Sequence, residues 1–424
     1  MTEKSAKPQL RFAGFDDTWE QRKAVDIADY SKGNGYSKSD LTKIGTPIIL
    51  YGRLYTKYQF TIDEVDTFAT PKDGSVYSQG NEVIIPASGE TSEDIARASA
   101  VEKSGILLGG DLNILRPFNF INPLFLALTI SNGEPQKELA KKAQGKSVVH
   151  IHNSDIQEVS VTFPTRAEQD RIVAVFRNLD NLITLHQRKY DKLTNVKKSM
   201  LEKMFPKNGS NVPEIRFKGF SDAWEQRKFD EVFDCTIPNN TLSRAELNYE
   251  SGSVRNIHYG DILIKYGSVV DVQNDEIPFA TGKSSDDFKG ALLQDGDIII
   301  ADTAEDETTG KACEIGNSQG LDVVSGLHTM VCRPRNKMAL GYLGYYLNSD
   351  AYHHQLLPLM QGIKVLSLSR TNVQKTMVCY PKSKAEQQLI ADCFRNLDHL
   401  ITLHQRELEK LKNLKKACLE KMFV

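Results

Sequence analysis

Residues 167–205 read AEQDRIVAVFRNLDNLITLHQRKYDKLTNVKKSMLEKMF, and residues 385–423 repeat them with 26 of 39 positions identical. In steps of four and three residues from Ile172, eight of ten positions in the first copy are apolar, tyrosine included. An apolar 4-3 repeat over nearly five heptads is typical of a coiled coil, and two copies in one chain can pair with each other. We therefore expect two paired helices, each about 55–60 Å long at about 1.5 Å per residue.

Two histidines occupy matched positions in this expected seam. One or two polar residues in an apolar seam can fix the register and the pairing of the helices, and His186 and His404 are candidates for that role. The alternative is that both histidines lie at the solvent-exposed edge of the seam and have no role in pairing. The expected seam residues are Leu179, Ile183, His186 and Leu193 in the first copy and Leu397, Ile401, His404 and Leu411 in the second.

A second repeat extends the duplication. It aligns QLRFAGFDDTWEQRK (9–23) with EIRFKGFSDAWEQRK (214–228), which are identical at 10 of 15 positions and contain the only two tryptophans, Trp19 and Trp224. The chain is therefore a tandem duplication. The expected divisions are an N-terminal segment (1–23), a first variable block (24–163), a central region (164–228) with a helix over 166–205, a second variable block (229–380) and a C-terminal helix segment (381–424).

Both variable blocks are expected to be mixed α/β domains. Short β-branched runs between Gly, Asn, Asp and Ser clusters predict strands. The expected strands are 47–52, 82–86, 147–152, 260–267 and 296–302, and the expected helices are 134–143 and 339–360. Short stretches of weak sequence similarity occur in the same order in the two blocks, for example QGKSVVHI (144–151) with QGIKVLSL (361–368). This order indicates that the blocks share one fold but differ in surface chemistry.

The composition excludes several classes of protein. The 424 residues allow two to four domains of about 100–200 residues, and 40% apolar with 25% charged residues is ordinary globular usage. No stretch approaches the roughly 20 apolar residues needed to cross a bilayer, and the start MTEKSAKPQL lacks the apolar core of a signal peptide. We therefore expect a cytoplasmic protein that does not enter a membrane. The six cysteines have neither CxxC pairs nor regular spacing, so we expect reduced thiols.

The order of variable block, AEQ-led helix, linker, RFxGFxDxWEQRK segment, second block and second AEQ-led helix strongly resembles the specificity subunit of a type I restriction-modification system. The resemblance covers essentially the whole chain. It implies two target recognition domains, separated by a long antiparallel two-helix coiled coil and related by a pseudo-twofold axis, which read the two halves of a split, asymmetric site in double-stranded DNA. It also implies a subunit without catalytic activity that docks two adenine-N6 methyltransferase subunits and, in a restricting complex, an ATP-driven translocase-nuclease. S-adenosylmethionine, ATP and Mg are then expected on the partner subunits, and no cofactor on this chain.

The alternative that the chain is itself an enzyme finds little support. Asn122-Pro123-Leu124-Phe125 approaches the Asn-Pro-Pro-aromatic loop of adenine methyltransferases, but it lacks the second proline and no cofactor loop precedes it. A packed segment that begins at Asn122 is the simpler interpretation. Gly310-Lys311 lacks both the preceding glycine and the following Ser or Thr of a phosphate-binding loop, and no histidine has a carboxylate or cysteine beside it at ligand spacing.

Base reading requires donors and acceptors on loops of a rigid frame. Loop stretches that concentrate Lys, Arg, Ser, Thr, Asn and Tyr are therefore candidates, although each single residue could equally be a solvated loop residue. In the first block the candidates are Ser37, Lys38, Ser39, Arg53, Tyr55, Thr56, Lys57, Lys146 and Ser147. In the second block they are Lys265, Tyr266, Lys283, Thr308, Thr309, Lys311, Lys364, Ser369, Arg370 and Asn372.

The charge distribution opposes dense phosphate contact by either block. The first block has 13 basic and 17 acidic residues, and the second has 12 basic and 20 acidic residues, whereas each neutralised phosphate requires a Lys or Arg. We therefore expect the partner subunits to supply much of the non-specific binding to DNA phosphates and these blocks to specify the base sequence. The remaining alternative is a coiled-coil adaptor with two partner-binding lobes and no role on DNA.

The two heptad seams predict that the helix pair sets the distance between the half-sites. Inserting seven residues after Leu193 and seven after Leu411 keeps both seams in phase and lengthens the pair by about 10 Å. Since DNA rises about 3.4 Å per base pair, we expect the recognised spacer to lengthen by up to about three base pairs while both half-site sequences stay the same. Methylation sequencing of cells carrying the variant reads out the spacer. An unchanged spacer in a variant that assembles would assign this distance to the partner subunits.

Overall fold

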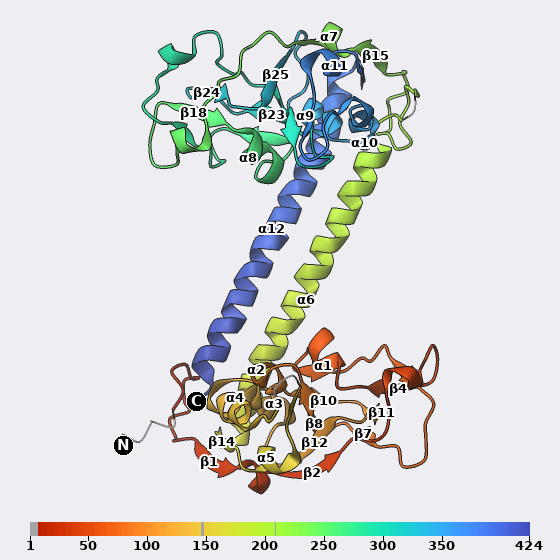
Figure 1. Ribbon diagram of the computed structural model, residues 1–424, viewed down its shortest axis with the longest axis vertical. Coiled ribbons are helices and arrows are strands. Elements are labelled where there is room, and N and C mark those ends of the chain that lie inside the picture. The colour runs from red at the N-terminus through yellow and green to blue at the C-terminus, as the bar shows by residue number, and fades with distance from the viewer. Residues whose placement is uncertain (1–6, 146–147, 208) are drawn as a thin grey trace. The chain divides into compact units, whose positions relative to one another are not determined.

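The computed structural model describes residues 7–145, 148–207 and 209–424, so the predictions for Lys146 and Ser147 lie outside the described residues. The chain forms two compact units (Figure 1). Unit 1 comprises the chain up to residue 186 together with 406–424, and unit 2 comprises residues 187–405. Each unit therefore contains one variable block and a part of both long helices.

Unit 1 contains fourteen short strands and five short helices among its described residues, followed by the start of a long helix. The strands are β1 (Glu20–Lys23), β2 (Ala28–Lys32), β3 (Leu41–Thr42), β4 (Thr46–Ile49), β5 (Thr61–Ile62), β6 (Phe68–Ala69), β7 (Tyr77–Gln79), β8 (Glu82–Pro86), β9 (Ser88–Gly89), β10 (Ser99–Val101), β11 (Ser104–Leu108), β12 (Leu112–Pro117), β13 (Val149–His150) and β14 (Ser160–Phe163). The helices are α1 (Arg53–Thr56), α2 (Ser92–Ile95), α3 (Pro123–Ile130), α4 (Gly133–Lys142), α5 (Asn153–Gln157) and the long α6 (Arg166–Lys203), with 3₁₀ turns η1 (Ala24–Asp26) and η2 (Lys38–Asp40).

Unit 2 repeats this arrangement. Its strands are β15 (Glu225–Lys228), β16 (Phe233–Asp234), β17 (Leu247–Asn248), β18 (Val254–Ile257), β19 (Val269–Asp271), β20 (Phe279–Ala280), β21 (Ile298–Ala301), β22 (Thr303–Ala304), β23 (Ala312–Gly316), β24 (Asp322–Ser325), β25 (Thr329–Pro334), β26 (Leu366–Ser367) and β27 (Met377–Tyr380). Its helices are α7 (Phe229–Val232), α8 (Tyr259–Ile264), α9 (Tyr342–Leu347), α10 (Asp350–His353), α11 (Arg370–Val373) and the long α12 (Lys384–Met422), with 3₁₀ turns η3 (Arg244–Glu246), η4 (Ser285–Phe288) and η5 (Leu357–Leu359).

The sheets of both units are mixed, as expected. The central sheet of unit 1 has the order β2-β12-β8-β10-β5, and that of unit 2 has the equivalent order β16-β25-β21-β23-β19. In both sheets the last pair of strands is parallel and the other pairs are antiparallel. A second sheet in each unit, β3-β6-β4-β11-β7 or β17-β20-β18-β24, also contains one parallel pair. Two different sequences therefore adopt one topology.

Each variable block begins and ends at the same place in its unit. In unit 1, β1 pairs with β14, so that Lys23 lies opposite Ser160. Next to this pair, the Arg11 guanidinium donates two hydrogen bonds, of 2.7 and 2.8 Å, to the buried carboxylate of Glu168 at the start of α6. These contacts bring together residues that are about 140–160 positions apart in the sequence.

Unit 2 forms the same closure. Strand β15 pairs with β27, and Arg216 donates hydrogen bonds of 2.7 and 2.9 Å to Glu386 at the start of α12. One difference separates the copies. The indole Nε1 of Trp224 also donates to Glu386, at 3.2 Å, whereas the buried Nε1 of Trp19 has no partner among the described residues.

Helices α6 and α12 pack together in each unit (Figure 1). In unit 1 the rings of Phe176 and Phe423 lie 5.8 Å apart, and Lys415 forms an ion pair with Asp180. Because the contact moves from Phe423 back to Lys415 as α6 advances from Phe176 to Asp180, the helices run antiparallel. The equivalent contacts in unit 2 join Phe394 with Phe205 and Asp398 with Lys197.

The structure places the expected seam residues at buried or half-buried positions of the two helices. These are Leu179, Ile183, His186 and Leu193 on α6, and Leu397, Ile401, His404 and Leu411 on α12. A role of the two histidines in fixing the register stays a prediction. Among the described residues, no helix is both long enough and apolar enough to cross a membrane.

Several local predictions are confirmed and two are wrong. The strand at 82–86 and the helix at 134–143 are present as β8 and α4, and Asn122 caps α3 by accepting hydrogen bonds from the next turn. The expected helix over 339–360 is broken into α9, α10 and the turn η5, where Pro358 cannot donate a backbone hydrogen bond.

The expected strand at 260–267 is instead the helix α8 and the turn after it. The His258 side chain accepts a hydrogen bond from Gly260 N, and Arg244 donates to Asp261 in the first helical turn. An aspartate near a helix N-terminus is favourable, and packing of the fully buried Ile262 holds the helix. These tertiary contacts outweigh the β preference of the isoleucines.

The Arg–Glu pairs predict unequal losses of stability in the two copies. Arg11→Met leaves the buried Glu168 carboxylate without a counter-charge, so we expect the free energy of unfolding of unit 1 to fall by about 3–5 kcal/mol. Arg216→Met should cost unit 2 less, because Trp224 still donates to Glu386. Urea unfolding of the full chain can be followed by the remaining tryptophan, with Trp224→Phe as the background for unit 1 and Trp19→Phe for unit 2.

The double variant Arg11→Met with Glu168→Leu is the control, because it removes both charges and should recover most of the loss. Equal losses for Arg11→Met and Arg216→Met would contradict the role assigned to the indole of Trp224.

Candidate nucleic-acid interface

A groove of about 1430 Å³ opens on unit 1. It lies among α1, η2, β9 and Val148. Six residues predicted to read bases line it: Ser37, Lys38, Arg53, Tyr55, Thr56 and Lys57. Ser39 lies beside the groove, exposed, with its hydroxyl 2.7 Å from that of Ser37. The structure thus brings together two stretches that the sequence separates by more than ten residues.

Two of these side chains build the wall of the groove. Arg53 is 8% exposed and donates to Asp66, Gln59 and a backbone carbonyl, which leaves it little freedom to contact a ligand. Tyr55 donates to the carbonyl of Ser88 at 2.8 Å, and the guanidinium of Arg97 lies over its ring. Burial raises the pKa of Tyr55 well above its usual value, so its hydroxyl stays protonated.

The exposed members of the set are better placed to contact a ligand. Lys38 and Thr56 are exposed at the groove, and Lys57 is 56% exposed in an ion pair with Asp66. A surface ion pair of this kind contributes little to stability, so Lys57 can exchange its partner at low cost.

Carboxylates also line the groove. Lys72 and the backbone N–H of Ser37 donate hydrogen bonds to Asp40, which lowers the pKa of this carboxyl to about 2 and keeps it charged. Asp66, Glu90, Asp94 and Asp111 complete the acidic lining. Acceptors of this kind repel phosphates but can bind the amino group of cytosine, which suits base reading better than backbone binding.

Unit 2 contains an equivalent of helix α1. Residues 51–58 (YGRLYTKY) align with 259–266 (YGDILIKY), and both form a short helix, with Leu54 and Ile262 buried at the matching position. Lys57 corresponds to Lys265, which donates to Glu276 at 2.6 Å. Tyr266 follows it but is only 4% exposed, so it packs in the core and does not reach the surface.

The loop after β22 carries three further predicted residues. Thr308 is exposed and its hydroxyl donates a hydrogen bond to Asp306. Thr309 is fully buried and therefore cannot contact a ligand. Lys311 is half-buried and donates at 3.0 Å to the carbonyl of Leu263 in α8, and burial lowers its pKa. Lys311 thus ties this loop to α8.

The structure distributes the remaining predicted residues of unit 2 over three places. Lys364 is exposed at the tip of the hairpin 361–367, and Lys283 is exposed in the turn after β20. Ser369 caps helix α11, in which Arg370 and Asn372 are half-buried. The predicted residues at α8, in the hairpin and in the loop that contacts both are therefore Lys265, Thr308, Thr309, Lys311 and Lys364.

Sequence reasoning missed several residues of the groove in unit 1. Arg97, Asp94 and Asp111 come from segments that had no loop signature, and they reach the groove only because strands β8, β10 and β12 are neighbours in the sheet. Tyr36 and Tyr51 lay inside stretches rich in Tyr, Ser and Gly, and that composition was the signal that could have found them.

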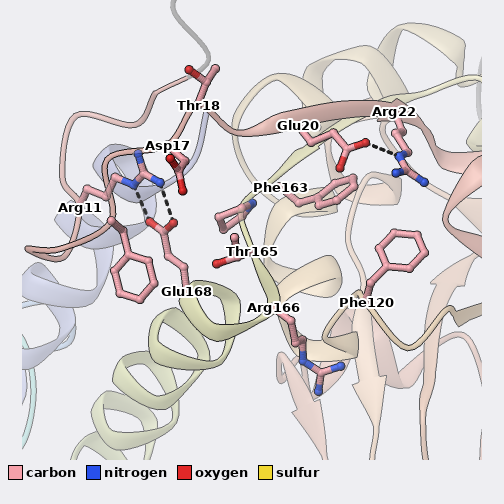
Figure 2. Close-up of a pocket in the computed structure, with 12 residues that line it drawn as sticks. Arg11, Asp17, Thr18, Glu20, Arg22, Phe120, Phe163, Thr165, Arg166 and Glu168 are labelled. Atoms are coloured by element: carbon pink, nitrogen blue, oxygen red, sulfur yellow. Dashed lines mark hydrogen bonds and ion pairs between the residues drawn. The ribbon is translucent and has the colours of Figure 1, made fainter.

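A second, smaller cavity of about 330 Å³ lies in unit 1 at the start of α6 (Figure 2). The Arg11–Glu168 pair forms one side, and Phe120 and Phe163 form another (Figure 2). The Arg22 guanidinium lies 5.1 Å from the centre of the Phe120 ring. Six of its twelve lining residues come from the repeated segment 9–23, so the cavity belongs to the part of the chain that closes unit 1.

We call the repeated segments (9–23 and 214–228) and the two long helices the frame. The exposed surface of this frame is the same in both units. The sequence EQRK of β1 is repeated in β15, although seven of these eight residues are exposed and the eighth is half-buried. On the long helices, Leu182 and Leu185 are 42% and 46% exposed, and their counterparts Leu400 and Leu403 are 40% and 44% exposed. Packing within the chain does not explain why these positions are identical.

Comparison with known proteins gives a consistent result. Residues 16–195 and 221–413 match the family model described as the Type I restriction modification DNA specificity domain. The chain is 21% identical to the MjaVIII specificity subunit of a type I restriction enzyme from Methanocaldococcus jannaschii, over 74% of this chain and 72% of the relative. It is 22% identical to the putative MjaX specificity subunit of the same organism, over 94% of this chain and 91% of the relative.

The fold is also similar to a solved structure. A crystal structure of the type I restriction-modification S subunit from M. genitalium superposes with a TM-score of 0.56 at 16% identity, and the match covers 99% of both chains. Three observations agree with this match: each variable block is followed by one of the duplicated helices, the two blocks share one topology, and the family model matches both halves. The chain belongs to the type I restriction-modification DNA specificity family.

Proposed function

We propose that each unit of this DNA specificity subunit reads one half of a bipartite, asymmetric site in double-stranded DNA. The observation that carries the proposal is a common frame with different exposed side chains. Helices α1 and α8 match in sequence and position, yet the exposed Thr56 on α1 corresponds to the exposed Ile264 on α8. Different side chains on one frame present different donors, acceptors and apolar groups to base edges, so the two half-sites differ.

The subunit is non-catalytic, and it specifies where partner subunits act. In the proposed complex, S-adenosylmethionine, ATP and Mg are bound by the partners, which act on cellular DNA in the cytoplasm. The acidic residues of the groove fit this division, because the partners can supply the phosphate contacts that the groove disfavours.

The proposed partners include two copies of an adenine-N6 methyltransferase subunit, joined in a restricting complex by a translocase-nuclease. Two equal binding sites require the same surface twice, and only the surface of the frame is repeated. In unit 1, Leu182, Leu185 and the 51% exposed Leu414 all lie outside the seam on α6 and α12. Leu182 and Leu414 each directly precede a seam position, so in an antiparallel pair they lie on the same flank of the seam.

Unit 2 repeats this apolar flank. Its members are Leu400, Leu403 and the 36% exposed Val196. Apolar side chains gathered on one flank of a helix pair are favourable only when a partner covers them, and an amphipathic helix of the methyltransferase subunit is the occupant we propose. One copy then binds to each flank.

Exchanging one variable block should replace one half-site and leave the other unchanged. The junctions are set by the strand pairs that close each block, so residues 24–159 of unit 1 can be replaced from Lys23 to Ser160 with the corresponding block of a relative. We expect methylation sequencing to report one new half-site and one retained half-site. A swap that changes both half-sites, or one that leaves the native site intact, would contradict independent reading, and only the second outcome would favour an adaptor without a role on DNA.

Removing the apolar flank of one unit should remove one partner copy. We expect Leu182→Ser with Leu185→Ser to change the stoichiometry from two methyltransferase subunits per chain to one, and the further changes Leu400→Ser and Leu403→Ser to abolish binding. Native mass spectrometry of the co-expressed subunits measures this ratio. Leu389→Ser is the matched control, because Leu389 is 43% exposed on α12 but its counterpart is Arg171, and two copies should remain bound. Two bound copies on the fourfold variant would disprove this docking site.

A further inference from the structure

Three aliphatic side chains are exposed on helix α8 and on the hairpin 361–367 of unit 2. Ile264 at the end of α8 is 89% exposed, and Ile363 and Val365 in the hairpin 361–367 are 100% and 51% exposed. Isoleucine is usually buried, and exposed apolar groups clustered around one site indicate a binding surface. The fold of unit 2 does not use these side chains.

The duplication identifies where these residues lie with respect to a ligand. Thr56, the counterpart of Ile264, and Val148, the counterpart of Val365, both line the groove of unit 1. The hairpin 361–367 of unit 2 is attached through β26, which pairs with β22 as β13 pairs with β9 in unit 1. Ile264 and the hairpin therefore occupy the positions in unit 2 that correspond to groove-lining residues of unit 1.

One loop connects these two elements. The hydroxyl of Thr309 lies 3.5 Å from the carbonyl of Leu366 at the base of the hairpin. Two residues later, Lys311 donates to the carbonyl of Leu263, the neighbour of Ile264. The loop thus lies between α8 and the hairpin and contacts both, which gathers the exposed isoleucines at one site.

Each of the two isoleucines is directly followed by a lysine. Lys265 directly follows Ile264, and Lys364 directly follows Ile363. Lys364 is exposed and makes no hydrogen bond or ion pair with any of the residues that the structure describes. Lysines beside an apolar contact can bind phosphate or guanine while the aliphatic group contacts a base.

We propose that unit 2 recognises thymine through its C5-methyl group, with Ile264 and Ile363 as the specificity-determining contacts in the major groove. The inference rests on the proposed function of reading DNA and goes beyond it by naming a base. Among the four base pairs, only those with thymine present a methyl group in the major groove. At the aligned sequence positions unit 1 has Thr56 and Lys146, of which only Thr56 carries a methyl group, so its half-site should depend less on methyl contacts at these places.

Replacing thymine with 2′-deoxyuridine tests the proposal, because uracil lacks only the methyl group. The full chain, assembled with its methyltransferase subunits, is titrated by fluorescence anisotropy against duplexes that carry the site found by methylation sequencing. Each thymine in the half-site of unit 2, assigned by the block exchange, is replaced one at a time. We expect binding about three- to fivefold weaker at each thymine that is contacted, the effect of losing one buried methyl group.

The variants Ile264→Ser and Ile363→Ser test the residues themselves, because serine has no methyl group that could replace the apolar contact. Both change highly exposed side chains, so the fold should be retained. We expect each variant to bind the thymine duplex more weakly and to lose the difference between thymine and uracil at its contacted base. Ile44→Ser is the matched control, because Ile44 is 89% exposed in unit 1 and should leave this difference unchanged.

The inference is overturned by equal binding of the thymine and uracil duplexes at every thymine of the unit 2 half-site, or by variants that keep the wild-type difference. Failure of the wild-type complex to prefer its methylated site over unrelated DNA would overturn the proposed function and this inference together.

Discussion

The closure of each variable block is the constraint on which the rest of the structure depends. Arg11 with Glu168 and Arg216 with Glu386 tie each repeated segment to the start of a long helix, and a strand pair beside each of them brings the two ends of the block together. A buried ion pair does not by itself add much stability, but removing one partner leaves an unpaired charge, which makes the arrangement specific. A domain whose ends are adjacent can be exchanged without disturbing the chain that carries it.

This closure explains how two divergent sequences keep one topology. In the central sheets, Glu82 pairs with Arg116 in unit 1, and Asp297 pairs with Arg333 at the matching place in unit 2. Around these fixed points the buried strands consist of branched aliphatic residues, which satisfy the same sheet in either copy. Side chains that project into the groove make few such contacts, so they are free to change with the DNA sequence that is read.

The long helices follow the opposite rule. Their seam is required for packing, but the exposed Leu182 and Leu185 are identical to Leu400 and Leu403 although neither pair packs in the core. Repetition of an exposed surface is what two copies of one partner require, whereas difference between exposed surfaces is what two half-sites require. Duplication within one chain therefore separates the two proposed functions: the repeated surface binds partners, and the divergent surfaces read DNA.

The sequence alone determined the duplication, the two long helices and the mixed fold of the blocks, because heptad spacing and the run at 82–86 are local patterns. Only the tertiary structure decided that 260–267 begins as a helix, since the Arg244–Asp261 pair and the burial of Ile262 join segments distant in the chain. The same holds for the candidate interface. Tyr266 and Thr309 look like polar loop residues in the sequence yet are buried, whereas Arg97 and Asp111 reach the groove through the order of strands in the sheet. Exposure depends on which distant segments cover a residue, and local sequence contains no record of them.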